Sequence, residues 1–175
     1  MSAGGNQGDP GGPIERAAEQ AETMARAGGS KCEALTSLVT AAEALSGGGA
    51  VVSILVLDQE GLLRNGASPN LPSDYLIAID RLKPDAHVGT CAAAAASGCS
   101  VITPDFQADE KWGELRHLPL ALGFVGAWSC PIKSPAGKVL GTFGTYFRSR
   151  RSPTPHEQQG VEQLATMAAL VLAAD

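Results

Sequence analysis

The sequence predicts a three-layer α+β domain built around a central, mostly antiparallel sheet. Four expected strands come in two pairs, joined by the short turns at 59–61 and 134–137. No strand–helix–strand alternation appears, which a parallel sheet would need. The first expected strand, 50–58, is apolar on nearly every residue and therefore needs cover on both faces. We expect the N- and C-terminal helices on one face and the middle of the chain as a lid of helices and loops on the other.

Composition bounds the class of protein. The chain has 175 residues, of which 44% are hydrophobic and 18% charged, enough for one domain with a full core. A net charge of −5 argues against a nucleic-acid partner, because phosphate contacts need clustered Lys and Arg. No apolar run approaches the roughly 20 residues of a membrane span, and the N-terminus lacks the segments of a secretory signal. We expect a cytoplasmic domain with neither a nucleic-acid nor a membrane partner.

The chain divides into three parts. Residues 1–13 are Gly, Pro and polar, and we expect a disordered tail. Residues 14–29 predict an N-terminal helical arm with a thin apolar stripe, ended by a Gly pair. Residues 30–175 are expected to form the folded domain.

The first half of this domain has clear helix and strand signals. Ser30 and Glu33 have the spacing of a capping box, which predicts a helix from there to about Ser46. Strands are expected over 50–58 and 62–67. A second helix is expected over 73–82, with Leu76, Ile79 and Leu82 facing inward.

The second half is less regular before it becomes regular again. A short helix of small residues is expected over 91–97, a short strand over 100–103 and a helix over 112–122 interrupted by Pro119. Two long strands follow, 125–133 and 139–148. Thr154 and Glu157 form a second capping box at the start of the last helix.

Five short motifs occur in order along this second half. They are GTCA at 89–92, SVITPD at 100–105, DEKW at 109–112, GFVGAWSCPI at 123–132 and GKVLGTF at 137–143. With these motifs the chain, over about residues 32–174, resembles a GAF domain, the small-molecule sensor module of bacterial signalling proteins. It looks closest to the subgroup found beside histidine-kinase, cyclic-di-GMP and response-regulator modules.

The sequence departs from the usual pattern of that subgroup at four places. His87 stands where the first motif usually has Gly, and Ala92 where a second Gly is usual. Asp109-Glu110 replaces Asp-Pro, and Pro119 interrupts the helix before the Trp-Ser strand. All four lie near the expected ligand chamber, so the identity of the ligand stays open.

The resemblance implies a ligand held between the sheet and a lid formed by residues 89–123. The sheet face beneath is expected around Trp128 and Phe143, although strand alternation does not tell which face meets the lid. The candidate ligand-binding residues are Cys91, Asp105, Phe106, Trp112, Leu115, Arg116, Phe124, Trp128, Phe143 and Tyr146. No catalytic residue and no metal ligand is expected, and any cofactor is unknown.

The same residues have structural interpretations. Trp112 and Trp128 could anchor irregular segments to the core, and Asp105 could bond the backbone amides of a turn. A closed, purely structural or dimerising domain of the same fold is therefore an alternative to a sensor.

An enzyme is a further alternative, because one GAF branch reduces free methionine sulfoxide with cysteines of the lid. Cys91 resembles one of those positions, but the stretch 107–122, which would carry the nucleophile, has no cysteine. On a helix Cys91 and Cys99 would be about 12 Å apart, whereas a disulfide needs Cα atoms within about 7 Å. We therefore expect no enzyme.

Three other ligand classes have weaker signals. A cyclic nucleotide could use the amides of 90–92 and the guanidinium of Arg116. A bilin chromophore would need a Cys-His pair, which the sequence lacks. Zinc is disfavoured because the four cysteines contain no CxxC spacing.

The last helix carries more apolar residues than one buried stripe needs. Val161, Leu164, Ala168 and Val171 fall on one face, while Met167 and Leu170 lie off it. We expect a homodimer through the first and last helices. The resemblance also implies a downstream signalling effector that receives the signal along these helices.

Overall fold

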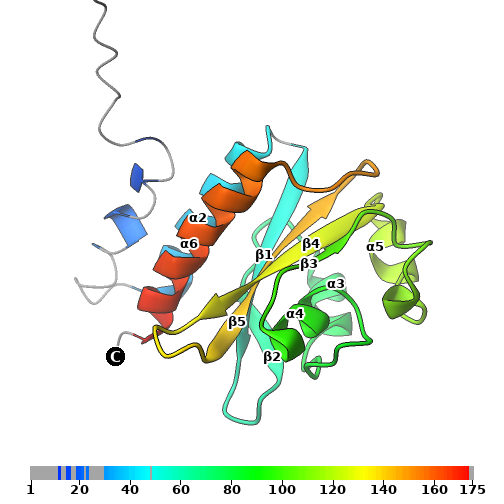
Figure 1. The fold of residues 1–175 in the computed structure, drawn as a ribbon, viewed down its shortest axis with the longest axis horizontal. Coiled ribbons are helices and arrows are strands. Elements are labelled where there is room, and N and C mark those ends of the chain that lie inside the picture. Colours follow the sequence, from blue (N-terminus) through cyan, green and yellow to red (C-terminus); the bar gives the residue numbers. More distant parts are fainter. Residues whose placement is uncertain are drawn as a thin grey trace, which may run out of the picture.

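A five-stranded antiparallel sheet lies at the centre of the computed structural model of this chain (Figure 1). The structure describes residues 12, 15–16, 19–21, 23, 30–47 and 49–173. The strand order is β2-β1-β5-β4-β3, and every neighbouring pair is antiparallel. The strands are β1 (Ala50–Leu57), β2 (Leu63–Ala67), β3 (Val101–Thr103), β4 (Gly126–Lys133) and β5 (Val139–Phe147).

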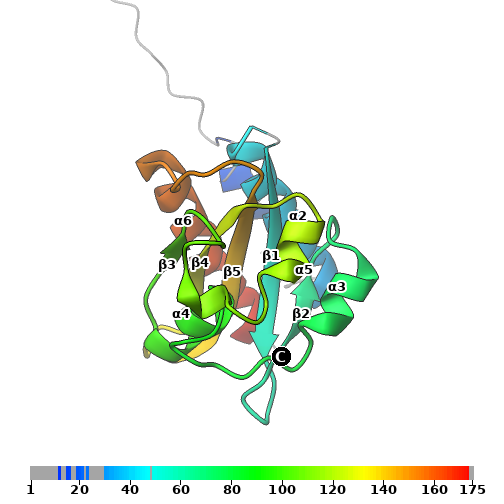
Figure 2. The same ribbon diagram turned by 90° about the vertical axis from the view of Figure 1, so that its right-hand side faces the viewer.

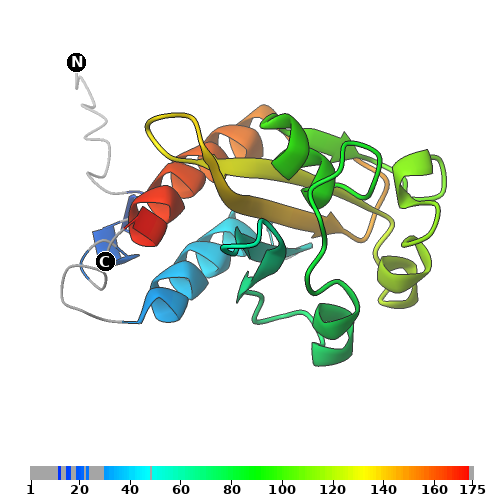
Figure 3. The ribbon, with the colours of Figure 1, turned by 90° about the horizontal axis from the view of Figure 1, so that it is seen from below.

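The helices divide between the two faces of the sheet. They are α2 (Lys31–Leu45), α3 (Ser73–Ala78), α4 (Cys91–Ser97), the 3₁₀ turn η1 (Glu110–Trp112), α5 (His117–Ala121) and α6 (Pro155–Ala173). Figure 3 shows the long α2 and α6 side by side on one face and the short middle elements on the other. The predicted three-layer α+β arrangement, with terminal helices opposite a lid, is confirmed.

The face under α2 and α6, here called the helix face, carries a densely packed apolar core. Its largest side chains are almost fully buried: Leu38, Ile54, Trp128, Ile132, Phe143, Phe147 and Leu164. The buried β1 lies between β2 and β5, as its continuous apolar sequence predicts.

The start of α6 is held by charge as well as by packing. Thr154 and Glu157 form the predicted capping box, in which each side chain accepts a hydrogen bond from the backbone amide of the other. Glu157 also accepts both guanidinium bonds of Arg151, at 2.6 and 2.7 Å, and one from Ser46 at the end of α2. These bonds tie α2, α6 and the segment after β5 together.

Two predictions for the first half of the domain are wrong in detail. Ser30 caps α2 without a side-chain hydrogen bond, so the first capping box does not form. The helix expected over 73–82 ends at Ala78, because Arg81 adopts a left-handed φ of 64° and Leu82 bridges to Leu63 of β2. Residues 81 and 82 therefore make backbone hydrogen bonds to Leu63 of the edge strand β2 instead of continuing the helix.

The helix expected over 112–122 is interrupted, but at residues 113–116 and not at Pro119. The turn η1 and the five-residue α5 replace one continuous helix. Pro119 lies in the first turn of α5, where a backbone amide has no intrahelical partner to lose. The lid is thereby made of short pieces, as Figure 2 shows from the side of α3 and α5.

Most of the predicted tail and helical arm lies outside the described residues. Of the arm, Glu15, Arg16, residues 19–21 and Thr23 are described and helical, and Ala21 is buried in the helix-face core. Among the residues described, no helix combines the length and apolar character that a membrane span requires.

Candidate functional site

Opposite the helix face, the sheet presents a surface here called the lid face. Its residues fall into rows set by the strand register. The middle row contains Ser53, Gly144 and Ser129, one from each of β1, β5 and β4. All three residues are small. The neighbouring rows contain the larger Tyr146 on one side and Leu55 on the other.

Helix α4 packs onto β4 and β5, and its run of small alanine side chains makes this close packing possible. Residues 92–95 are all buried. A Cβ atom at position 144 would lie 2.9 Å from the sulfur of Cys91, closer than real contacts allow. Glycine at 144 thus lets the Cys91 side chain rest on the sheet, and a larger residue would force the sulfur to move.

A small cavity of about 20 Å³ lies between the lid face and the lid. That volume holds about one water molecule. The cavity is lined by residues of β1, β4 and β5, of α3 and the segment after it, and of the lid. They are Leu55, Tyr75, Ile79, Leu82, Gly89, Thr90, Cys91, Trp112, Leu115, Ala127, Trp128, Gly144, Thr145 and Tyr146. None of these described residues has a charged side chain.

Two tyrosines close one side of the cavity. Tyr75 of α3 donates a 2.8 Å hydrogen bond to the hydroxyl of Tyr146 on β5, and the rings meet edge to face at 5.8 Å. Burial raises the pKa of both phenols, so they remain neutral hydroxyls. Through this bond α3 becomes part of the lid.

A chain of hydrogen bonds fixes Trp112 over the cavity. Its indole Nε1 donates to Thr90 Oγ1 at 2.8 Å, and Thr90 donates to Thr103 at 3.1 Å. Thr103 donates in turn to Asp109, which also binds Lys111. Burial acts to raise the pKa of Asp109, but hydrogen bonds from Lys111 and Thr103 outweigh it and hold the pKa below its ordinary value. The buried polar side-chain atoms in this series of hydrogen bonds, from Trp112 to Asp109, are therefore paired.

Cys91 has a different environment. Burial raises the pKa of its thiol, although the hydroxyls of Ser129 and Thr142 lie near enough to oppose the shift. Neither hydroxyl makes a hydrogen bond of ordinary geometry with any described residue. The Cys91 thiol near them is only a weak donor and acceptor, so it does not replace such a bond. Cys91 is consequently a neutral thiol and a poor nucleophile. It lies at one end of α4 and Cys99 follows the other end, and both are free.

The structure brings six of the ten predicted site residues together. Cys91, Trp112, Leu115 and Tyr146 line the cavity. Phe106 packs on Trp112 with ring centroids 4.4 Å apart, and Phe124 packs on Tyr146 at 5.3 Å. These two phenylalanines support the wall from behind.

Of the other four residues, Trp128 alone borders the cavity. Its side chain and that of Phe143 pack in the helix-face core, so the face that meets the lid, which strand alternation left open, is the opposite one. Asp105 bonds the amide of Gln107 and pairs with Arg150 at the surface, which is its structural interpretation. Arg116 donates to two backbone carbonyls and does not line the cavity.

Several residues of the site were not predicted. Tyr75, Ile79 and Leu82 belong to a segment before the expected lid, although the inward face of Ile79 and Leu82 was predicted. Thr90, Ser129 and Thr142 are hydroxyl residues inside motifs, where the sequence gives no sign of which are paired. Strand alternation put Ser129 and Trp128 on different faces of the same strand. Once the lid face is known, this alternation identifies Ser129 as the residue that points toward the lid.

The lining limits the ligands that this site suits. An anion such as a cyclic nucleotide would meet no cation there, because the guanidinium of Arg116 is bound elsewhere. Among the described residues no group of three potential metal ligands occurs. A neutral molecule with an apolar body and a hydrogen-bonding group matches the lining.

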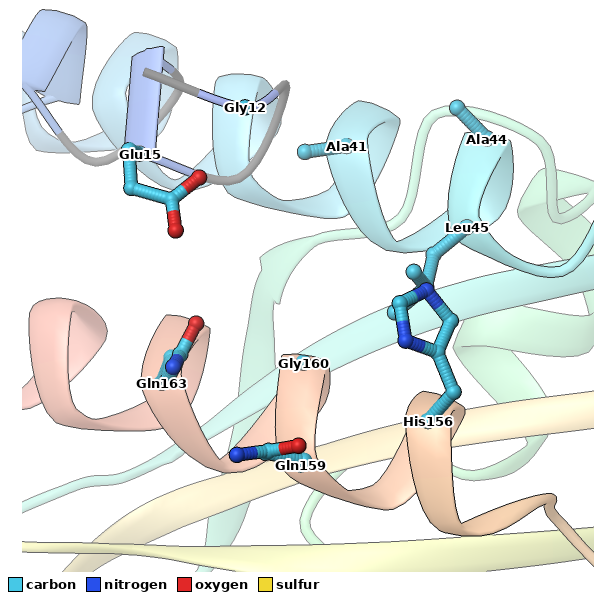
Figure 4. Close-up of a pocket in the computed structure, with 9 residues that line it drawn as sticks. All are labelled: Gly12, Glu15, Ala41, Ala44, Leu45, His156, Gln159, Gly160 and Gln163. Carbon is cyan, nitrogen blue, oxygen red and sulfur yellow. The ribbon is translucent and has the colours of Figure 1, made fainter. Parts of the chain in front are cut away.

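A larger hollow of about 500 Å³ lies between α2, α6 and the described N-terminal residues (Figure 4). Glu15 and Gln163 point into it from opposite sides, and His156 lies beside Leu45. Small residues, Ala41, Ala44 and Gly160, form much of the helical wall. This hollow is on the helix side of the domain and shares no residue with the cavity under the lid.

Comparison with known sequences gives one family and one relative. The family described as the GAF domain matches residues 32–173. The "Methyl sulfide methyltransferase-associated sensor" of Methanosarcina acetivorans is 32% identical over 146 residues, which is 83% of this chain. The chain spans only 14% of the length of that relative.

Solved structures of low identity share the fold. The GAF domain of a phosphoenolpyruvate-protein phosphotransferase from Coxiella burnetii has a TM-score of 0.72 at 18% identity, covering 92% of this chain and 93% of the other. The free methionine-R-sulfoxide reductase of Neisseria meningitidis, solved with its substrate, has a TM-score of 0.65 at 15% identity, covering 92% and 89%. At these identities the likeness concerns the fold alone.

Proposed function

The chain belongs to the GAF domain family, and from this premise we propose that it is a sensory signalling domain that binds a small neutral molecule between the sheet and the lid. The relative named as a sensor supports the signalling role. The observation that carries the ligand proposal is the cavity under the lid, where aromatic rings and hydroxyls converge without a charged group.

Binding requires the lid to move away from the sheet. At about 20 Å³ the cavity is too small for any organic ligand. The lid elements that would move are only three to seven residues long, so separating them breaks few hydrogen bonds. The ligand's apolar body would replace contacts among Tyr75, Tyr146 and Trp112.

The signal would leave through the sheet and α6. Strands β4 and β5 carry the cavity on one face and contact α6 on the other. Trp128 and Phe143 are buried directly behind the lid face, where a shift of either strand would reach α6. An effector that responds to the position of α6 is part of the proposal.

A second copy of the chain is the proposed partner at the helix side. Leu170 of α6 is 51% exposed, and Met167 beside it is only partly buried. Small residues on α2 and α6 would allow close helix packing near Ala44 and Gly160. Size-exclusion chromatography with light scattering should give a dimer mass for the wild type and a monomer for Leu170→Glu; a wild-type monomer at high micromolar concentration would contradict this.

The surroundings of Cys91 support a binding role and not a catalytic one. Its thiol is neutral and faces hydroxyls instead of a base. The four free cysteines suit a reducing compartment, so we place the protein in the cytoplasm.

Native mass spectrometry of the full chain purified from cells tests the ligand proposal. We expect an added small mass that disappears on denaturation. Leu115→Trp, which fills the lid side of the cavity, should abolish the added mass and keep the fold. Leu170→Glu is the matched control, because it changes the helix side and should retain the small molecule.

The alternative is a closed GAF domain that acts only through dimerisation. The small volume of the cavity favours it. Only bare protein in the wild-type spectrum, together with no lid response to a library of neutral compounds in hydrogen-exchange measurements, would establish this alternative and overturn the sensor proposal.

A further inference from the structure

We propose that Ser129 and Thr142 form the hydrogen-bonding end of the ligand site, and that the side chain of Cys91 is a plug that covers them while the site is empty. The inference deepens the proposed function and rests on it. A ligand's neutral polar group, a hydroxyl, carbonyl or amide, would take the place of the thiol and bond both hydroxyls.

The first observation is a pair of unsatisfied buried groups. Ser129 and Thr142 are both 0% exposed, and neither hydroxyl has a hydrogen-bond partner among the described residues. A buried hydroxyl without a partner costs about 1 to 3 kcal/mol, and such groups are rare in folded proteins. Valine or alanine would fill either position in a strand without that cost.

The second observation is where these hydroxyls lie. Ser129 is opposite Gly144 in the middle row of the lid face, and Thr142 is two residues before Gly144 on β5. Cys91 lines the cavity, which neither Ser129 nor Thr142 does, and its sulfur lies over Gly144, the residue opposite Ser129 and two residues along β5 from Thr142. The thiol is therefore the wall between the cavity and the unpaired pair.

Neighbouring hydroxyls show that pairing is the rule on this face. Ser53, in the same row, bonds Ser68 at 2.7 Å. Thr90 and Thr103 are fully engaged in the chain that holds Trp112. The unpaired groups on the lid face are confined, within the described chain, to the two positions under Cys91.

The other two unsatisfied groups are not ligand candidates. Trp128 and Thr145 lie opposite each other in register and border the cavity, but strand alternation directs their side chains away from the face of Gly144, toward the helix-face core. The side chains around them, Phe143 and Phe147, are fully buried in the helix-face core. A ligand would have to unfold that core to reach them, whereas the Cys91 plug lies on a seven-residue helix.

The chemistry of the pair defines the ligand class. A serine or threonine hydroxyl both donates and accepts, so the pair suits a neutral group and does not discriminate donors from acceptors. The remainder of the molecule would contact Leu55, Tyr146 and Trp112. Phenol has these properties, and toluene has the same shape without the hydroxyl.

The test uses phenol and toluene as probes with the full chain. Cys91→Ala removes the sulfur and joins the cavity to the two hydroxyls, so we expect it to bind both probes. Adding Ser129→Ala and Thr142→Val should weaken phenol about tenfold relative to toluene, the loss expected for two hydrogen bonds. Comparing the ratio of affinities cancels the different hydration of the two probes.

Cys91→Ser is the matched variant. Its hydroxyl would bond the pair and fix the plug, so phenol should bind more weakly than to Cys91→Ala. If the triple variant does not fold, Cys91→Ala with Thr142→Val alone should still lower the phenol-to-toluene ratio, by a few fold.

Two results would overturn the inference. One is an unchanged ratio after the hydroxyls are removed, and the other is failure of Cys91→Ala to bind either probe. Neither decides the proposed function, because the co-purified mass of the wild type and its loss in Leu115→Trp are measured independently of Cys91.

Discussion

The two faces of the sheet are built on opposite principles. The helix face buries large side chains under α2 and α6, of 15 and 19 residues. The lid face buries small residues and hydroxyls under helices of five to seven residues. Long helices and large apolar side chains give stability, while short elements over small residues can separate from the sheet at lower cost.

The polar groups of the two faces differ in the same way. At the edge of the helix side, Arg151 and Glu157 form a two-bond ion pair, and the guanidinium lies 3.9 Å over the Phe147 ring. The lid face has neutral hydroxyls, some paired and some not. The lid itself contains the ion pair between Asp109 and Lys111, but the polar groups of the sheet surface beneath it are neutral hydroxyls.

The largest effect expected is from Phe143→Ala on the helix face. Phe143 is fully buried, and removing its ring should cost about 3 to 5 kcal/mol of unfolding free energy. Phe106→Ala is the matched change on the lid side, at equal burial, and should cost less because the short lid can collapse or open. Urea denaturation measures both. If the two variants lost equal amounts of unfolding free energy, the helix face would not contribute more to stability than the lid face.

The next largest effect is expected from Glu157→Gln. Hydrogen bonds from Arg151 lower the pKa of Glu157 from 4.5 to about 2. A carboxylate with a depressed pKa stabilises the fold fully above the unfolded value and loses this contribution as pH falls toward the folded value. The variant should therefore lose about 2 to 3 kcal/mol at pH 7 and converge with the wild type between pH 4.5 and 2.

Arg150→Met provides the control for this prediction. Arg150 pairs with Asp105, but its side chain is 73% exposed. Exposed pairs contribute about 0 to 1 kcal/mol. The contradicting result concerns the difference in unfolding free energy between Glu157→Gln and the wild type. If this difference grew as the pH fell, the ion pair would not be what stabilises α6.

The secondary structure was largely predictable because local signals agree with the fold. The alanine run followed by Gly98 predicted α4 nearly to the residue. The turn at 134–137 likewise predicted the β4–β5 hairpin. The end of α3 was missed because a backbone bridge from Leu82 to β2 overrides helix propensity. No sequence pattern specifies such a long-range bond.

The site was predicted less completely, for a physical reason. Alternation divides β4 into two sets of residues, but the choice of face depends on packing of segments far away in sequence. Trp128 and Phe143 were predicted to contact the ligand because aromatic residues suit a pocket. In the structure both side chains pack in the helix-face core. The status of Ser129 and Thr142 depends on hydrogen-bond geometry, which composition does not reveal.

A smaller effect is expected when a paired hydroxyl is removed from the lid face. Thr90→Val deletes the acceptor of Trp112 Nε1 and leaves a buried indole donor unpaired. The expected loss is about 1 to 2 kcal/mol, with a shift of indole fluorescence as the lid loosens. An unchanged spectrum together with unchanged stability would mean that the hydrogen-bond chain does not hold the lid.

The smallest effect, and the sharpest contrast, is expected from the same substitution at an unpaired position. Thr142→Val keeps the side-chain shape and the preference for a strand, and removes a hydroxyl that has no described partner. Without ligand, stability should stay equal or rise by up to about 1 kcal/mol, since no hydrogen bond is lost and no polar group is buried unpaired. Urea denaturation of both valine variants in parallel makes the comparison. A loss at 142 as large as that at 90 would show that the Thr142 hydroxyl is satisfied in the free protein, and the unpaired end of the site would no longer distinguish the lid face.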